Sequence, residues 1–166
     1  GAAAAYHVPF GLRLRGVLDT QALRRALNRI VARHESLRTT FVQIDGEPLQ
    51  RIAPADESGF ALVEKATKST METAGLADAE VVARFDLEHG PVIRGLLIRE
   101  AADLHTLLIT MHHIVSDGWS MSVFVGELGK LYEAYAKGGD DPLPPLELHY
   151  ADYAIWQRKW VSGELL

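Results

Sequence analysis

Residues 92–113 read VIRGLLIREAADLHTLLITMHH, and this stretch decides the fold. Val92 to Arg99 and Leu104 to Met111 are both rich in β-prone residues, and the polar segment Glu100 to Asp103 between them is typical of a turn. Two strands joined by so short a connection are expected to pair antiparallel. The second strand ends in two adjacent histidines, so a buried sheet strand leads directly into titratable side chains.

Upstream of this stretch the sequence predicts a strand, a helix and a hairpin. Apolar and polar residues alternate from Tyr6 to Leu14, as in a strand with one wet face. Asp19 precedes apolar residues spaced by three and four, so we expect it to cap a helix that packs on a sheet. An Asp-Gly pair at 45–46 separates Thr39 to Ile44 from Leu49 to Ile52, which predicts a hairpin.

The remaining elements complete an α+β chain. Phe60 to Val63 is predicted to be a strand, whereas Thr73 to Phe85, Met121 to Tyr135 and Tyr150 to Trp160 have helical patterns. Strands outnumber helices and alternate with them along the chain. This order predicts an α/β sandwich, a mixed and mostly antiparallel sheet with helices packed on it.

Composition is typical of one folded domain or part of one. The chain has 166 residues, of which 48% are hydrophobic and 23% charged. Its 17 Lys and Arg against 22 Asp and Glu give a net charge of −5. An acidic balance gives no electrostatic basis for binding nucleic acid or an anionic membrane, so neither is an expected partner.

The absence of cysteine excludes disulfides, cysteine-type zinc sites and a thiol nucleophile. It allows a reducing compartment, and we expect a cytoplasmic location. The longest run without Asp, Glu, Lys or Arg, from Leu104 to Ser116, has 13 residues. A membrane-spanning helix needs about 17–25 apolar residues, so this run is too short.

The chemistry-bearing segment is HHIVSDG, residues 112–118. Neighbouring side chains on a strand point to opposite faces, so one of His112 and His113 is expected to face a site and the other to be held in the fold. Imidazole has an ordinary pKa of about 6.5, which suits a general base at neutral pH. Asp117 follows at a distance of four residues from His113, and Gly118 would permit a turn that lets Asp117 orient a ring or pair with an arginine.

The residues alone leave a structural role for this segment open as well as a catalytic one. A metal site is weakly supported, because the other histidines form no His-x-x-x-His pair and no third ligand is evident. A serine triad fails, because no Gly-x-Ser-x-Gly segment exists. Ser116 and Ser120 are therefore interpreted as turn or cap residues.

The segment 112–118 resembles the His-His-x-x-x-Asp-Gly motif of nonribosomal peptide synthetase condensation domains. Arg33 to Phe41 (RHESLRTTF), Phe85 to Pro91 (FDLEHGP) and Tyr150 to Trp156 (YADYAIW) resemble three more segments of that family, in the same order. The resemblance implies a fold similar to chloramphenicol acetyltransferase, built from two lobes with the active site at their junction. The family's opening motif and second lobe have no counterpart here, so residues 1–166 are expected to be the N-terminal lobe.

The resemblance also implies an activity and its partners. The expected reaction is amide formation between an aminoacyl or peptidyl thioester on a donor carrier protein and an aminoacyl group on an acceptor carrier, with an L-configured donor and acceptor. Both substrates would be tethered to phosphopantetheine, and the domain itself would bind no cofactor and no metal. The implied partners are the two peptidyl carrier proteins, the C-terminal lobe and a neighbouring adenylation domain.

The family's motif assigns roles to the central residues. His113 would accept a hydrogen bond or a proton from the attacking amine, or help stabilise the tetrahedral intermediate, and His112 would be its neighbour in the motif. Asp117 would be structural, paired with an arginine of the upstream motif, for which we favour Arg33. Gly118 would lie beside the route by which the acceptor pantetheine arm enters.

Three further residues are expected to support the site. Arg38, near a helix C-terminus, suits either a salt bridge or the helix dipole. Trp119 is more commonly a packing anchor than a substrate contact. Ser120 completes the segment.

Two other functions stay open. A related acyltransferase could use coenzyme A thioesters, and a non-catalytic module could dock a carrier protein without doing chemistry. For residues 1–166 alone we expect weak catalysis or none, because half of the cleft wall would be missing.

Overall fold

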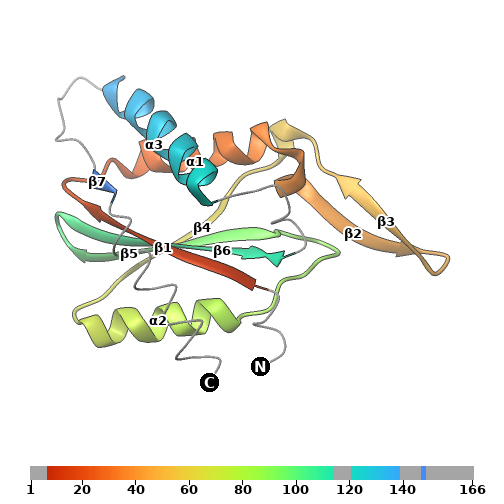
Figure 1. Ribbon diagram of the computed structural model, residues 1–166, viewed down its shortest axis with the longest axis horizontal. Coiled ribbons are helices and arrows are strands. Elements are labelled where there is room, and N and C mark those ends of the chain that lie inside the picture. Colours follow the sequence, from red (N-terminus) through yellow and green to blue (C-terminus); the bar gives the residue numbers. More distant parts are fainter. Residues whose placement is uncertain (1–6, 114–120, 139–146, 149–166) are drawn as a thin grey trace.

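The computed structural model describes residues 7–113, 121–138 and 147–148. A five-stranded sheet in this part of the chain lies between two helical layers (Figure 1). Helices α1 (Thr20–Arg33) and α3 (Met121–Lys137) cover one face of the sheet, and α2 (Thr70–Val82) covers the other. This arrangement confirms the predicted sandwich of sheet and helices.

The sheet is mixed and mostly antiparallel, as predicted. Its strands, in the spatial order β4-β5-β6-β1-β7, are β4 (Ala61–Ala66), β5 (Ile93–Ala101), β6 (Leu104–His112), β1 (His7–Arg15) and β7 (Glu147–Leu148). Strands β4 and β5 are parallel and are connected through α2, whereas the other neighbours pair antiparallel. The sequence pattern did not predict β7, which is only two residues long.

The hairpin forms where the Asp-Gly pair indicated. Strands β2 (Thr39–Ile44) and β3 (Glu47–Ile52) make a separate two-stranded sheet that extends away from the body of the molecule (Figure 1). Asp45 has φ 53° and Gly46 has φ 79°. Positive φ at both central residues is the type I′ geometry that joins tightly paired strands, so the turn residues explain the register.

The two N-terminal helix caps explain where α1 and α2 begin. Oδ1 of Asp19 accepts the N–H of Ala22 at 3.0 Å, which confirms the predicted cap of α1. Ser69 does the same for α2, accepting the N–H of Glu72 at 3.1 Å. Helix α2 therefore begins and ends three residues earlier than the predicted range 73–85, because Ser69 caps it and Phe85 lies beyond its end.

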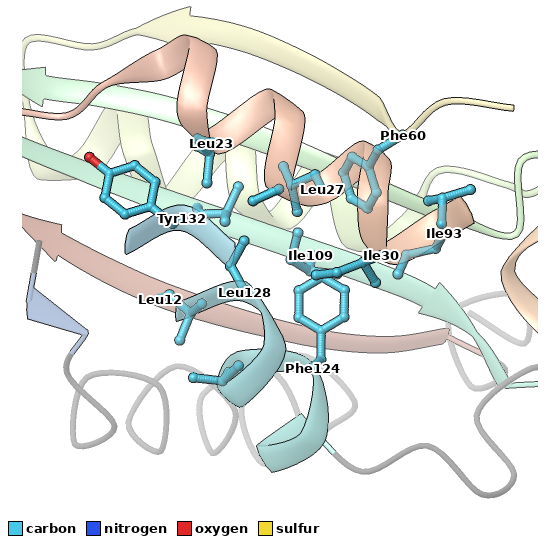
Figure 2. Close-up of a cluster of buried hydrophobic side chains, with 14 of the residues drawn as sticks. Leu12, Leu23, Leu27, Ile30, Phe60, Ile93, Ile109, Phe124, Leu128 and Tyr132 are labelled. Atoms are coloured by element: carbon cyan, nitrogen blue, oxygen red, sulfur yellow. The ribbon is translucent and has the colours of Figure 1, made fainter. Parts of the chain in front are cut away.

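Helices α1 and α3 share one apolar core with the sheet (Figure 2). Ten of its members are labelled there: Leu12, Leu23, Leu27, Ile30, Phe60, Ile93, Ile109, Phe124, Leu128 and Tyr132. The rings of Phe10 and Phe124 meet nearly edge to face with centroids 5.4 Å apart, a favoured geometry for an aromatic pair. The hydroxyl of Tyr132 also accepts the N–H of Asp19 at 3.0 Å, so α3 is joined to the start of α1.

Part of the prediction lies outside the described residues. This applies to the expected helix from Tyr150 to Trp160 and to the segment 114–120. Among the helices that the structure describes, none is both long and apolar enough to cross a bilayer.

Candidate functional site

The two adjacent histidines at the end of β6 occupy different environments. His112 is the last residue of β6, and its backbone N–H donates to the carbonyl of Val92 at 2.9 Å. Its side chain is half-buried, whereas that of His113 is exposed. The residue just before β5 thus holds the backbone of His112 in place immediately before His113.

The half-buried imidazole belongs to a cluster of three rings, His7, Phe85 and His112, which we call the aromatic cluster. The ring centroid of Phe85 lies 5.0 Å from that of His7 and 5.8 Å from that of His112, and both contacts are nearly perpendicular at 89°. His7 and His112 are register partners on β1 and β6, with ring centroids 6.1 Å apart. Nδ1 of His7 also lies 2.6 Å from the carbonyl oxygen of Val81, near the end of α2.

Burial shapes the acid–base behaviour of His112. Desolvation lowers the pKa of His112 below its ordinary value, and the neighbouring His7 and His113 lower it further. Burial therefore favours the neutral form of the His112 ring. A neutral, half-buried ring packed against Phe85 is suited to supporting the fold at this point.

The upstream arginine Arg33 is paired with α3. Its Nε lies 2.9 Å from Oε1 of Glu127, and Nε2 of His34 lies 2.9 Å from Oε2 of the same carboxylate. The Glu127 side chain is 18% exposed and that of Arg33 is 48% exposed. One carboxylate thus joins the end of α1 to α3.

The guanidinium of Arg38 donates hydrogen bonds to three backbone carbonyls. Its Nε donates to Val31 O at 3.0 Å, Nη2 to Ala32 O at 3.2 Å and Nη1 to Ala53 O at 2.5 Å. The first two are carbonyls in the last turn of α1, where the helix dipole favours a cation. Of the two roles that the sequence left open for Arg38, these contacts match the one at the helix end.

The rest of the predicted site lies outside the described residues, namely Asp117, Gly118, Trp119 and Ser120. The pairing of Asp117 with Arg33 therefore stays a prediction. The contact with Glu127 is made through the Nε of Arg33. In the described ranges, no three His, Asp or Glu side chains gather as a metal site would require.

Two of the segments that carried the family resemblance meet in space. The N–H of Phe41 donates to the carbonyl of Leu87 at 2.6 Å, so β2 is bonded to the segment 85–91. Within that segment Oδ1 of Asp86 accepts the N–H groups of Glu88 and His89 at 3.0 and 3.1 Å. These bonds fix the loop whose first residue, Phe85, belongs to the aromatic cluster.

Sequence reasoning missed the residues that hold His112. His7 is opposite His112 only because of the register between β1 and β6, which a single sequence does not reveal. Phe85 was part of a recognised segment, but its contact with His112 joins loop to strand over 27 positions. The sequence offered one signal. His7 lies at the start of one predicted strand and His112 at the end of another, so antiparallel pairing of these strands would bring the two histidines together.

A cavity of about 460 Å³ lies near the opposite end of β6. Its lining includes Thr20, Lys65, Arg99 and His105, and His105 is the second residue of β6. The histidine pair lies at the other end of the same strand, so this cavity is separate from the candidate site.

Comparisons with known proteins agree on one family. The model of the family described as Condensation domain matches residues 1–165. A linear gramicidin synthase of Brevibacillus parabrevis is 47% identical over 165 residues, covering 97% of this chain and 2% of that protein. Malpibaldin synthetase of Mortierella alpina is 45% identical over 166 residues, covering 98% of this chain and 3% of that protein.

Solved structures give the same result. The X-domain of teicoplanin biosynthesis, in its complex with OxyB, has a TM-score of 0.73 and 34% identity, covering 96% of this chain and 34% of that one. The starter condensation domain of rhizomide synthetase RzmA has a TM-score of 0.73 at 18% identity, covering 82% of this chain and 34% of that one, a likeness of fold. The chain belongs to the condensation-domain family of nonribosomal peptide synthetases.

Proposed function

We propose that this chain is the N-terminal lobe of a domain that forms an amide bond between two carrier-bound substrates. The donor is an L-aminoacyl or peptidyl thioester, and the acceptor is an L-aminoacyl group on the downstream carrier. One observation carries the proposal: the segment HHIVSDG begins at the end of β6, where a half-buried His112 is followed by an exposed His113. The 47% identity with the linear gramicidin synthase of Brevibacillus parabrevis supports it.

The chemistry requires little beyond positioning. The amine nitrogen attacks the thioester carbonyl carbon, a C–N bond forms, the C–S bond breaks, and the leaving thiolate takes up a proton. A thioester is already activated, and an α-amine with a pKa of about 7.7–8.0 is partly unprotonated at neutral pH. His113 accepts a hydrogen bond or the proton from the attacking amine, which holds the nitrogen against the carbonyl.

Neighbouring residues keep this geometry. Asp117 pairs with Arg33 and fixes the turn that follows the histidines. Gly118 leaves room for the acceptor pantetheine arm. Both substrates arrive on the phosphopantetheine of peptidyl carrier proteins, and the domain consumes no cofactor.

A non-catalytic docking role is the second candidate. The observation that favours it is the 34% identity with the teicoplanin X-domain, a protein whose solved complex contains OxyB. A coenzyme A-dependent acyltransferase is the third, since chloramphenicol acetyltransferase-like folds share the histidine segment.

One assay separates the three functions. The synthetase module containing this lobe is supplied with a loaded donor carrier, with the corresponding coenzyme A thioester, or with neither, and dipeptidyl product on the downstream carrier is measured by mass spectrometry. Product from the carrier-bound donor alone supports the proposal. Equal product from coenzyme A favours the acyltransferase, and no product from either donor favours the docking module.

The donor configuration and the competence of the lobe are tested in the same system. An L-configured donor residue is expected to give more product than its D-epimer. Residues 1–166 alone are expected to give little or no product, since the chain spans 34% of the solved RzmA domain. Turnover by the lone lobe at the rate of the whole module would contradict this part.

A further inference from the structure

Arg94 on β5 binds the end of α2. Its Nη2 donates to the carbonyls of Glu80 and Ala83 at 2.6 and 2.7 Å, and its Nη1 donates to that of Arg84 at 3.3 Å. Nε completes the set with an ion pair to Oε1 of Glu80 at 2.7 Å. The side chain of Arg94 is only 15% exposed. A guanidinium suits this place because the last carbonyls of a helix are unpaired and carry partial negative charge.

The same guanidinium lies over the aromatic cluster. The Cζ atom of Arg94 is 4.0 Å from the ring centroid of Phe85, within the range of a cation–π contact. The Phe85 ring in turn meets His112 at 5.8 Å and 89°. Arg94, Phe85 and His112 therefore form a continuous stack from the end of α2 to the end of β6.

A second connection leads from α2 to the same point. Nδ1 of His7 lies 2.6 Å from Val81 O, and the His7 ring packs against Phe85 at 5.0 Å. His7 is the register partner of His112. The His112 ring therefore contacts His7, which lies against Val81 O in the last turn of α2, and Phe85, over which Arg94 lies.

We infer that Arg94 is a positioning residue for His113, acting through Phe85 and His112, an inference that rests on the proposed function. The stack fixes the rotamer of His112 and the backbone from which His113 projects. Misplacement of a reacting group by about 1 Å can cost about 100-fold in rate, so a small rotation at His112 is enough to slow the reaction.

Charge alone does not explain the arrangement. A lysine could neutralise Glu80 and lie over Phe85, but its single ammonium cannot donate to three carbonyls in one plane as a guanidinium can. A purely structural role predicts that loss of Arg94 lowers stability without a specific effect on turnover. Removing a second ion pair elsewhere on the sheet distinguishes the positioning role from the purely structural one.

Arg13 provides that control. Its Nη2 is 2.7 Å from Oε2 of Glu100, with side-chain exposures of 27% and 15%, comparable to the 15% and 22% of the Arg94–Glu80 pair. Arg13 is opposite Thr106, near the start of β6 and away from His112. The variants Arg94→Gln and Arg13→Gln each remove one such arginine.

The experiment measures Tm, kcat and KM for both carriers in the synthetase module containing this lobe, with Arg94→Gln, Arg94→Lys, Arg13→Gln and His113→Ala. We expect Arg94→Gln to lower kcat about tenfold or more with little change in KM, because only the placement of a reacting group is lost. Arg13→Gln is expected to lower Tm less than Arg94→Gln, because Arg13 donates to Glu100 alone whereas Arg94 also donates to three carbonyls, and to keep kcat within about twofold of wild type. Arg94→Lys should give an intermediate kcat.

Two further variants address a failure of Arg94→Gln to fold. Phe85→Leu keeps an apolar side chain but removes the ring, and Phe85→Tyr keeps the ring. The stack predicts a loss of kcat for Phe85→Leu and near-normal kcat for Phe85→Tyr.

The inference is overturned if the kcat of Arg94→Gln, or of Phe85→Leu where the former does not fold, is no lower than that of Arg13→Gln. His113→Ala separates this result from failure of the proposed function. If His113→Ala turns over normally, both fall together. If His113→Ala is slow while the Arg94 and Phe85 variants are not, only the positioning role is wrong.

Discussion

The Nε atom of Arg33 lies 2.9 Å from Oε1 of Glu127, so the last residue of α1 is ion-paired with α3. The same carboxylate contacts His34. These contacts complement the apolar packing between the two helices and fix the end of α1, from which the segment 33–41 begins. The ion pair between Arg33 and Glu127 therefore fixes the position of the segment 33–41 relative to α3.

Glu127→Gln is expected to destabilise the protein by about 1 kcal/mol, because Arg33 and His34 lose a charged partner while remaining partly exposed. Chemical denaturation measures the loss. Glu133→Gln is the control on the same helix. It removes an exposed ion pair in which Oε1 of Glu133 lies 2.8 Å from Nζ of Lys137. A loss for Glu127→Gln no greater than that for the control would show that the α1–α3 pair contributes nothing.

Gly95→Ala is expected to destabilise the fold by about 1–3 kcal/mol through overpacking. A Cβ at this position would stand 2.7 Å from Cε1 of Phe60 and 3.2 Å from Cδ1 of Ile109, both in the main core. Gly75→Ala is the matched control in α2, where nothing lies within 4 Å of the added Cβ. That change should raise stability by up to about 1 kcal/mol, since Gly is a poor helix former. Thermal unfolding of both variants tests the difference in sign.

Phe124→Ala is expected to cost about 3–5 kcal/mol, because it removes a fully buried ring and its contact with Phe10. Val123→Ala, at an adjacent side chain that is 48% exposed, should cost far less. Denaturant titration compares the two. Similar losses would mean that α3 does not pack on the sheet through Phe124.

His112 and His89 are expected to titrate in opposite directions from the ordinary histidine value. Burial lowers the pKa of His112, whereas a hydrogen bond to Asp86 raises the pKa of His89. For His112, the unfolded chain binds a proton near pH 6.5 and the folded protein only at lower pH. Its contribution to stability is therefore lost as pH falls from about 6.5 toward the folded pKa.

Histidine Cε1–H signals followed by NMR between pH 4 and 9 give both pKa values in one sample. Asp86→Asn should lower the pKa of His89 and leave that of His112 in place. A pKa for His112 equal to or above that of His89 would contradict the burial of the His112 ring.

Local signals in the sequence were sufficient for much of the fold. The Asp-Gly turn of the β2–β3 hairpin and the Asp19 cap of α1 depend on neighbouring residues, and both were predicted correctly. The pairing of β5 with β6 also followed from a short polar connection. Strand β7 was missed because two residues carry no periodicity, and its pairing with Leu14 and Arg15 spans most of the chain.

The candidate site was predictable only along one segment. The alternation of side chains on a strand predicted different environments for His112 and His113; the structure has His112 half-buried as the last residue of β6 and His113 exposed just beyond the strand. Arg94 is in β5, Phe85 follows α2 and His112 ends β6. These residues meet only because of the sheet register and the position of the end of α2, which the sequence alone does not give. The choice of Glu127 as a partner of Arg33 likewise depends on how α3 packs beside α1.

The central claim is that the imidazole of His113 acts on the attacking amine. The most direct measurement is the rate of dipeptidyl transfer to the downstream carrier by the synthetase module with His113→Ala, alongside wild type and under single-turnover conditions. We expect a loss of about 100-fold or more at unchanged carrier affinity, in line with removal of a general base. A His113→Ala module that forms product at the wild-type rate would contradict it.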